Sequence, residues 1–296
     1  MPRFLEGEPL LYNGWIWIVK GIEHPDGYVV AYPRYCIECI PPRKLYRAEY
    51  LRKINYYKWN CVDLDVPVIP RDKVYLIYPR PWRVTQEFIS LLCELSGIEC
   101  SDIILTGSLV IGLDPLTSDT DLVVYGRENV DRVYEALVYL RESGATSPLG
   151  MHGSLIEYKK HGDLLFEDYM LLRRYSVLQG FYKNKYRYTI RLVPYDHGFS
   201  GCTDPVIWSS MVRLKIVILE EISPYTTPAI YRVGLLDRVL RTDTAIMLSY
   251  RIRYTELRKG TILQGLFRIE KRLKSKNYYL IPDHGSQRIL GISSRS

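Results

Sequence analysis

Hydrophobic residues in the first 80 positions fall in short runs that alternate with polar residues and are separated by glycine or proline. The runs occupy residues 15–19, 28–32, 65–70 and 73–78. The first two flank Pro25-Asp26-Gly27, a sequence whose residues favour a tight turn. We therefore predict a β-rich N-terminal domain over residues 1–80, which ends where Pro79-Arg80-Pro81 interrupts the pattern.

The hydrophobic spacing changes to that of helices after residue 81. Apolar residues recur three and four positions apart over residues 84–95 and 130–140, and Gly97 and Gly144 follow as stop signals. A further helix is expected over residues 163–175, buried strands over 103–105 and 122–125, and a hairpin over 181–195. Helices that alternate with short strands predict a compact α/β unit, which we place at residues 81–200.

The hydrophobic period becomes two beyond Gly198, as in half-buried strands. Five strands are expected, over residues 211–222, 229–234, 244–254, 261–273 and 278–281. Short strands with turn residues between them favour a small β-barrel or sandwich, which we place at residues 201–296. The chain as a whole is thus expected to be an α+β protein of three domains.

The composition is that of a soluble globular protein, with 47% hydrophobic and 25% charged residues. This balance excludes a disordered or collagen-like chain. No run approaches the roughly 18 apolar residues that a membrane span requires, so no membrane insertion is expected. Glu6 and Glu8 precede the first apolar run, which is unlike a secretory signal, and we expect a cytoplasmic protein.

The net charge of +7 resides in the last third of the chain. Residues 1–200 hold 24 Lys and Arg against 25 Asp and Glu, whereas residues 201–296 hold 16 against 8. Nine of the basic residues, with only two acids, lie in the segment 251–276. A basic segment beside a neutral body suggests a phosphate-rich partner, although solubility alone would also account for it.

Aromatic residues are interleaved with these basic side chains. Arg251 and Arg253 alternate with Ile252 and Tyr254, which in a strand would place both charges on one face. Such a face can follow a sugar–phosphate backbone and stack bases, so RNA or DNA is the expected partner; the alternative is a solvated sheet face. The candidate nucleic-acid contacts are Arg251, Arg253, Arg268, Lys271 and Arg272.

The clearest chemistry lies between positions 105 and 124. Gly107-Ser108 directly follows a predicted strand, where its backbone amides and hydroxyl are available to a phosphate. Asp119 and Asp121 stand two apart at the head of the next predicted strand, so both carboxylates project from one face. Like charges held this close repel unless a cation lies between them, and Mg²⁺ or Mn²⁺ suits such oxygen ligands.

This combination resembles the DNA polymerase β-like nucleotidyltransferase superfamily over residues 81–197. The signature of that superfamily is an apolar strand, Gly-Ser, a short helix, and Asp-x-Asp at the head of an apolar strand. The resemblance implies that Asp119 and Asp121 hold two metal ions and that Gly107 and Ser108 contact a nucleoside triphosphate. It also implies in-line attack by an acceptor hydroxyl, expected to belong to RNA or another nucleic acid. The flanking regions are similar to those of archaeal proteins that carry such a domain.

The third carboxylate of that superfamily has no direct counterpart. The family motif is apolar-Asp-apolar-Val-Pro, and the best match places Arg191 where the acid should stand, in Ile190-Arg191-Leu192-Val193-Pro194. Arg191 would either grip the triphosphate or neutralise the aspartates, and the latter predicts a silent fold that binds nucleic acid or acts as a scaffold. Asp196 is the first candidate to replace the missing acid, and Asp163 and Glu167 are the others.

Two of the six cysteines, Cys36 and Cys39, have the spacing of metal ligands or a redox pair. A zinc site would need two more ligands, for which His24 and Cys61 are available. A local disulfide and plain buried thiols are the alternatives. The chain also has 26 Tyr but few amide side chains, a bias typical of hyperthermophiles, whose intracellular proteins tolerate disulfides.

Overall fold

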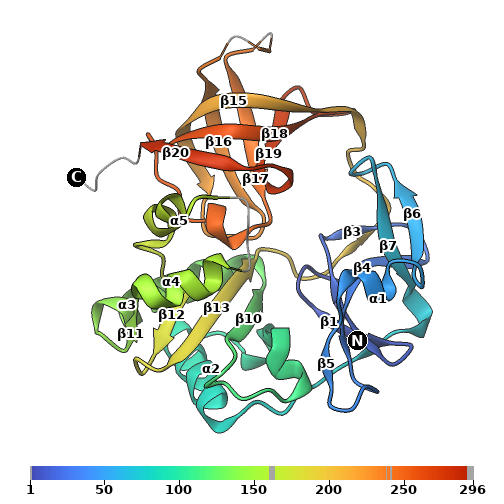
Figure 1. The fold of residues 1–296 in the computed structure, drawn as a ribbon, viewed down its shortest axis with the longest axis vertical. Coiled ribbons are helices and arrows are strands. Elements are labelled where there is room, and N and C mark those ends of the chain that lie inside the picture. The colour runs from blue at the N-terminus through green and yellow to red at the C-terminus, as the bar shows by residue number, and fades with distance from the viewer. Residues whose placement is uncertain (1, 160–163, 238, 241, 292–296) are drawn as a thin grey trace. The chain divides into compact units, whose positions relative to one another are not determined.

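The computed structural model describes residues 2–159, 164–237, 239–240 and 242–291. This described part is a mixed α+β protein, mostly strands, with five α-helices and four sheets, so the predicted α+β class is confirmed. The chain forms two compact units, Met1–Ser147 with Phe181–Thr203, and Pro148–Gly180 with Asp204–Ser296 (Figure 1). The first unit therefore combines the N-terminal segment with most of the expected catalytic segment. The division into three domains stays a prediction.

The N-terminal part of the first unit is an antiparallel sheet in the order β6-β7-β4-β2-β1-β8, with β5 paired to β4. Its strands are β1 (Pro9–Tyr12), β2 (Trp15–Val19), β4 (Tyr28–Cys36), β5 (Arg43–Lys44), β6 (Asn55–Trp59), β7 (Leu64–Pro70) and β8 (Tyr75–Leu76). The short helix α1 (Arg47–Tyr50) follows β5. Gly27 has a φ of +75° in the predicted turn, which is closed by a hydrogen bond from Tyr28 N to Pro25 O. Alternate residues of β2 and β4, such as Trp17 and Val29, enter a buried cluster.

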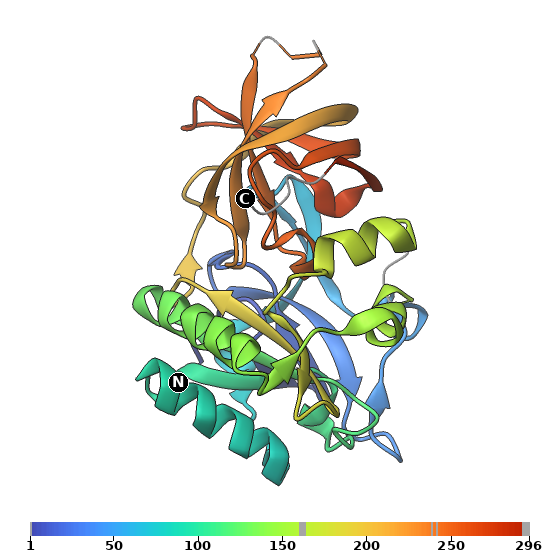
Figure 2. The same ribbon diagram turned by 90° about the vertical axis from the view of Figure 1, so that its left-hand side faces the viewer.

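The second sheet of this unit has the order β11-β12-β13-β10-β9. Its strands are β9 (Ile103–Thr106), β10 (Thr120–Tyr125), β11 (Thr146–Ser147), β12 (Gln179–Tyr182) and β13 (Tyr186–Val193). β10 runs parallel to β13 and antiparallel to β9. The predicted helices are confirmed as α2 (Arg83–Ser96) and α3 (Arg127–Glu142), which run side by side along one face of the sheet (Figure 2). Phe88 of α2 stacks on Tyr182 with ring centroids 4.6 Å apart.

The opposite face of this sheet is covered by the N-terminal segment. Val123 and Tyr125 of β10 and Val193 of β13 form a buried cluster with Leu5. Both faces of β10 are therefore buried, which explains why residues 122–125 form a continuous apolar run.

A further small parallel pair joins β3 (Glu23–His24) to β14 (Phe199–Ser200), and residues 71–73 and 100–102 form short 3₁₀ turns.

The second unit contains α4 (Gly150–Tyr158), α5 (Phe166–Arg173) and a six-stranded sheet in the order β15-β16-β17-β19-β18-β20. The strands are β15 (Val206–Ser223), β16 (Ala229–Leu235), β17 (Thr244–Ser249), β18 (Ile262–Arg272), β19 (Tyr278–Ile281) and β20 (Gln287–Gly291). Because β15 also pairs with β18, the strand pairings close into a ring. Tyr231, Phe267 and Ile269 fill its core together with Tyr169 of α5.

Two sequence expectations for this unit were wrong. The strand predicted over residues 244–254 ends at Ser249, because Ile252–Tyr254 form a 3₁₀ helix. The strand β20 follows a second 3₁₀ helix, Pro282–His284, and had not been predicted. The predicted helix over residues 163–175 corresponds to α5, and position 163 lies outside the described residues.

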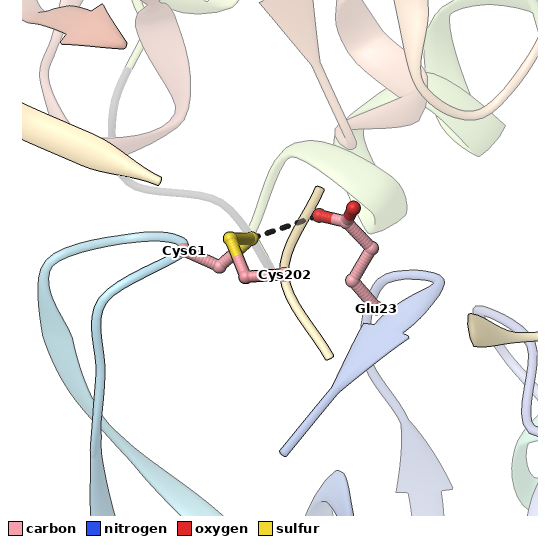
Figure 3. Close-up of side chains that lie close together, drawn as sticks. All are labelled: Glu23, Cys61 and Cys202. Atoms are coloured by element: carbon pink, nitrogen blue, oxygen red, sulfur yellow. Dashed lines mark hydrogen bonds between the residues drawn. A yellow bond between two sulfur atoms is a disulfide. The ribbon is translucent and has the colours of Figure 1, made fainter. Parts of the chain in front are cut away.

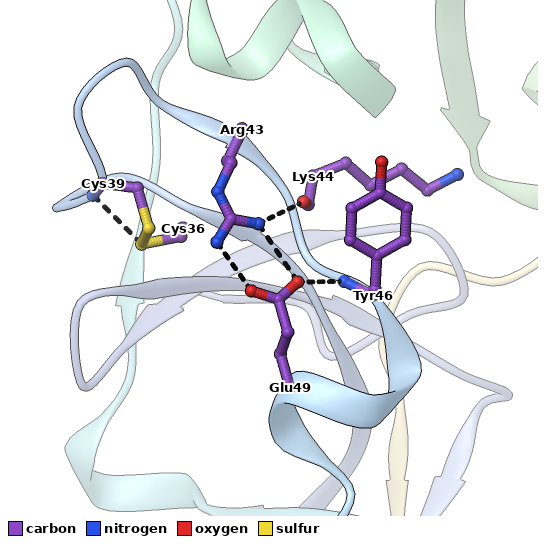
Figure 4. Close-up of a disulfide and its surroundings, with 6 residues drawn as sticks. All are labelled: Cys36, Cys39, Arg43, Lys44, Tyr46 and Glu49. Carbon is purple, nitrogen blue, oxygen red and sulfur yellow. Dashed lines mark hydrogen bonds and ion pairs between the residues drawn. A yellow bond between two sulfur atoms is a disulfide. The ribbon is translucent and has the colours of Figure 1, made fainter.

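All six cysteines form disulfides, namely Cys36–Cys39, Cys61–Cys202 and Cys93–Cys100. The local disulfide between Cys36 and Cys39 lies beside Arg43, which is paired with Glu49 (Figure 4). The alternative zinc site is wrong, because Cys61 is bonded to Cys202. His24 is buried, donates from Nε2 to Phe4 O at 2.7 Å and accepts from Val30 N at 3.2 Å. None of the helices in the described ranges is long and apolar enough to cross a membrane.

Candidate functional site

The Gly-Ser turn and the Asp-x-Asp segment meet where β9 joins β10. In the antiparallel register of these strands, Asp121 lies opposite Thr106, and Gly107 is the next residue. Gly107 has a φ of +72°, and a Cβ added to it would lie 2.8 Å from Asp121 Cβ and closer still to the carboxylate. A glycine is therefore required here both for its backbone conformation and for the space that Asp121 occupies.

A second contact joins the same two segments. Gly107–Ile111 form a 3₁₀ helix that ends at Gly112, and the Ser108 hydroxyl is hydrogen-bonded to that of Ser118. Residues 112–119 thus return to the Gly-Ser turn before β10 begins at Thr120. The two halves of the sequence motif, which are ten residues apart, form one local site.

The neighbouring strand β13 supplies the residues beside the aspartates. Its parallel register places Thr189 opposite Asp121 and Arg191 opposite Val123. Because alternate residues of a strand share a face, Asp121, Val123, Thr189 and Arg191 lie on the same side of the sheet. The position directly across from Asp121 is therefore a threonine.

Two arginines of β13 form ion pairs with different carboxylates. Arg187 Nη2 lies 3.8 Å from Asp119 Oδ1, and the side chains of both residues are 14% exposed. Arg191 Nη1 lies 3.8 Å from Oε1 of the buried Glu6. Burial alone would raise the pKa of Glu6, but the charges of Lys20 and Arg191, with hydrogen bonds from Lys20 and Gly21, outweigh it and lower that pKa below its ordinary value.

Asp196, the first proposed substitute for the third carboxylate, lies at the far end of β10 from the aspartates. An added Cβ at Gly126, the first residue after β10, would lie 3.3 Å from Asp196 Oδ1. Gly126 is five residues from Asp121, or about 16 Å along an extended strand. The structure therefore does not bring Asp196 together with Asp119 and Asp121. Glu167 belongs to α5 of the second unit, and Asp163 is outside the described residues.

Tyr35 of β4, in the N-terminal sheet, lies near the aspartate pair. Its side chain is 4% exposed and packs with Ile16 and Val110. Burial, together with the negative charges of Asp121 and Asp119, raises the pKa of Tyr35 to about 12. The phenol is therefore neutral and lies within electrostatic reach of the aspartate pair. No sequence motif marks Tyr35, Glu6 or Arg187, and sequence reasoning missed all three.

The predicted nucleic-acid contacts in the second unit differ in exposure. Arg251 is exposed, whereas Arg253 and Arg268 are only 3% and 5% exposed. Because residues 252–254 form a 3₁₀ helix, Arg251 and Arg253 do not alternate along a strand, and that part of the predicted basic face is wrong.

The remaining two candidates lie on β18 and contact tyrosines of β19. Lys271 Nζ is 5.0 Å from the ring centroid of Tyr278, and the guanidinium of Arg272 is 4.5 Å from that of Tyr279. Glu270 accepts from Arg272 at 3.0 Å and pairs with Arg268 at 3.3 Å. Part of the positive charge on this strand is therefore neutralised internally.

The chain was also compared with models of known protein families, with curated proteins and with solved structures, and no match was found. The geometry of the residues themselves is thus the basis for any functional assignment.

Proposed function

We propose that the protein is a metal-dependent nucleotidyltransferase with a polymerase β-like core, which moves a nucleoside monophosphate from a nucleoside triphosphate to an acceptor hydroxyl. The observation that carries this proposal is the close approach of Gly107 to Asp121, because it unites the phosphate-binding turn and the acidic pair. The antiparallel β9–β10 pair and the parallel β10–β13 pair, with α3 between those two strands in sequence, support the proposed core.

The donor set is suited to a hard divalent cation. Asp119 and Asp121 belong to one extended segment, and their carboxylates are partly exposed. Mg²⁺ or Mn²⁺, held by these two residues, would neutralise the triphosphate and lower the pKa of the acceptor hydroxyl. The Arg187 guanidinium beside Asp119 partly compensates the same charge.

The other residues of the site position the substrates. The Gly107 turn and the Ser108 hydroxyl would hold phosphate oxygens. Arg191, expected from the sequence to contact the nucleotide, would be oriented by its ion pair with Glu6. Arg187 would contact a phosphate after releasing Asp119. The acceptor is proposed to be RNA or another nucleic acid held by Lys271 and Arg272, and the reaction to take place in the cytoplasm, where nucleoside triphosphates are available.

A catalytically silent protein of the same fold is the second candidate. The Arg187–Asp119 ion pair favours it, because a cation already occupies the neighbourhood of one of the two carboxylates. Arg191 at the position expected for the third carboxylate favours it as well, and Thr189, which lies opposite Asp121 on the same strand, is not a carboxylate either. Such a protein would bind nucleic acid or serve as a scaffold without transferring nucleotides.

Nucleotide transfer and metal binding together distinguish these candidates. The protein would be incubated with labelled nucleoside triphosphates, bulk RNA and Mg²⁺ or Mn²⁺, beside an Asp119→Asn/Asp121→Asn control that keeps side-chain volume. We expect incorporation and Mn²⁺ binding by the wild type and neither by the control. Equal incorporation by both proteins would overturn the proposed site. No incorporation, with Mn²⁺ binding gained only in Arg187→Gln, would establish the silent alternative.

A further inference from the structure

Three potential metal ligands from separate segments meet in the first unit, away from the aspartate pair in sequence. Glu23 belongs to β3, Cys61 to the turn between β6 and β7, and Cys202 follows β14. One ligand atom from each lies within 4.8 Å of the other two, and Figure 3 shows the carboxylate directed at the sulfur atoms. The fold thus assembles two cysteine sulfurs and one carboxylate at a single point.

The carboxylate of Glu23 is held in a fixed orientation. Its Oε1 accepts hydrogen bonds from the backbone N–H of Thr203, at 2.9 Å, and from the Thr203 hydroxyl. Its Oε2 lies 2.9 Å from Cys61 Sγ. Outer hydrogen bonds of this kind orient metal-ligating carboxylates in proteins. Thr203 therefore satisfies one oxygen and directs the other at the cysteines.

The oxidation state of Cys61 and Cys202 determines whether the Glu23 carboxylate lies beside a disulfide or beside two thiols. In the disulfide, neither sulfur carries a hydrogen that it could donate to the carboxylate. A dithiol reductant that supplies two electrons and two protons would convert the disulfide into two thiols and itself become a disulfide. Two thiolates and one carboxylate in close contact repel one another unless a cation binds between them. Thiolate ligands select Zn²⁺ over hard ions such as Mg²⁺.

The surroundings leave one side of this cluster accessible. Cys61 is buried in an apolar cluster with Val30, Trp59 and Val68, whereas Cys202 and Glu23 are partly exposed. An apolar side strengthens the attraction between the ion and its ligands, and the exposed side admits a water molecule. Three protein ligands with one open tetrahedral position form a well-known zinc arrangement.

We propose that the reduced protein binds one Zn²⁺ through Glu23, Cys61 and Cys202, with water as the fourth ligand. Binding displaces the two thiol protons, and two-electron oxidation to the disulfide by a disulfide oxidant releases the ion. The same two cysteines, 141 residues apart, are joined in both states. The ion therefore replaces the covalent cross-link under reducing conditions.

Cobalt(II) is a spectroscopic probe for this site. The reduced full-length protein would be titrated with Co²⁺, which gives a thiolate charge-transfer band when cysteine sulfur ligates it. We expect saturation at one equivalent, loss of the band in Cys61→Ser/Cys202→Ser, and binding weaker by about tenfold or more in Glu23→Gln. The matched control Cys36→Ser/Cys39→Ser should retain the band. A band that persists in Cys61→Ser/Cys202→Ser, or is lost in the control, would overturn the proposal.

A measurement on the wild type covers the case in which a variant fails to fold. The reduced protein would be alkylated with and without Zn²⁺, and the modified cysteines identified by peptide mass spectrometry. Zinc should protect Cys61 and Cys202 while Cys36 and Cys39 react at an unchanged rate. Equal alkylation of Cys61 and Cys202 with and without the ion would contradict zinc binding. Neither experiment depends on nucleotide transfer, so their outcome is independent of the proposed enzymatic activity.

Discussion

Replacing Gly107 by alanine tests whether Asp121 lies so close to the Gly-Ser turn that residue 107 must lack a side chain. Gly112, at the other end of the same 3₁₀ helix, is the matched control, because it also has a positive φ, +82°, but nothing lies within 4 Å of an added Cβ. The left-handed backbone should cost each variant about 1–2 kcal/mol. Gly107→Ala must also displace the Asp121 side chain, which should add about 1–3 kcal/mol.

The two variants would be compared by urea denaturation and by Mn²⁺ binding. We expect Gly107→Ala to be less stable than Gly112→Ala by about 1–3 kcal/mol, equivalent to a Tm difference of roughly 2–12 °C for a unit of this size. Mn²⁺ affinity should fall in Gly107→Ala and stay at the wild-type value in Gly112→Ala, because only the first change moves a carboxylate. Equal stability and equal metal affinity of the two variants would refute the close approach of Asp121 to Gly107.

Three further predictions concern ion pairs and basic residues. Because the pKa of Glu6 is lowered in the folded protein, its stabilising contribution is present above the ordinary carboxyl pKa and is lost as the pH falls through the folded value. Urea unfolding should therefore find Glu6→Gln less stable than wild type by about 1–3 kcal/mol at pH 7, and a gap that does not narrow in acid would contradict this. The buried Arg173 donates to Ile252 O at 2.7 Å and pairs with Glu256. Arg173→Met should therefore lower the free energy of unfolding by about 3–5 kcal/mol, whereas Arg174→Met, at an exposed position, should lower it by no more than about 0.5 kcal/mol. If RNA binds the second unit, Lys271→Gln should lower the slope of log affinity against log salt by about one, and an unchanged slope would exclude Lys271 from the interface.

Local sequence signals were sufficient for several elements. The run at residues 15–19 coincides with β2, and the helical spacing at 84–95 lies within α2, because in both cases one face of the element is buried. The 3₁₀ helix at residues 252–254 was missed because the alternation of Arg251 to Tyr254 is compatible with a strand. Only the tertiary contacts of that segment distinguish the two.

The candidate site was predictable only where it is local in sequence. Gly107, which directly follows β9, and Asp121 of β10 are only 14 positions apart, and the motif itself indicates that they meet. Arg187 approaches Asp119 because β13 runs parallel to β10 in the observed register. Tyr35 comes near the aspartates because the N-terminal sheet, to which it belongs, packs against Val110. Contacts of this range depend on how whole elements pack, and hydrophobic periodicity carries no information about them. The same reason explains why Cys61 was assigned to the wrong partners.

Residues 4–8 connect the N-terminal sheet directly to the strand that carries the aspartates. Gly7 has a φ of +91°, and an added Cβ would lie 2.8 Å from Val123 Cγ2, two residues beyond Asp121. The Tyr125 hydroxyl donates to Glu6 O at 3.3 Å, and Glu6 in turn pairs with Arg191. The strand face that bears Asp121 is thus closed by the N-terminal segment over the next four residues, which leaves the beginning of β10 as the accessible end. The surroundings of the aspartate pair are therefore set by the N-terminal segment as well as by the motif, because that segment supplies Glu6, which pairs with Arg191, and Tyr35, whose phenol lies in the field of the aspartates.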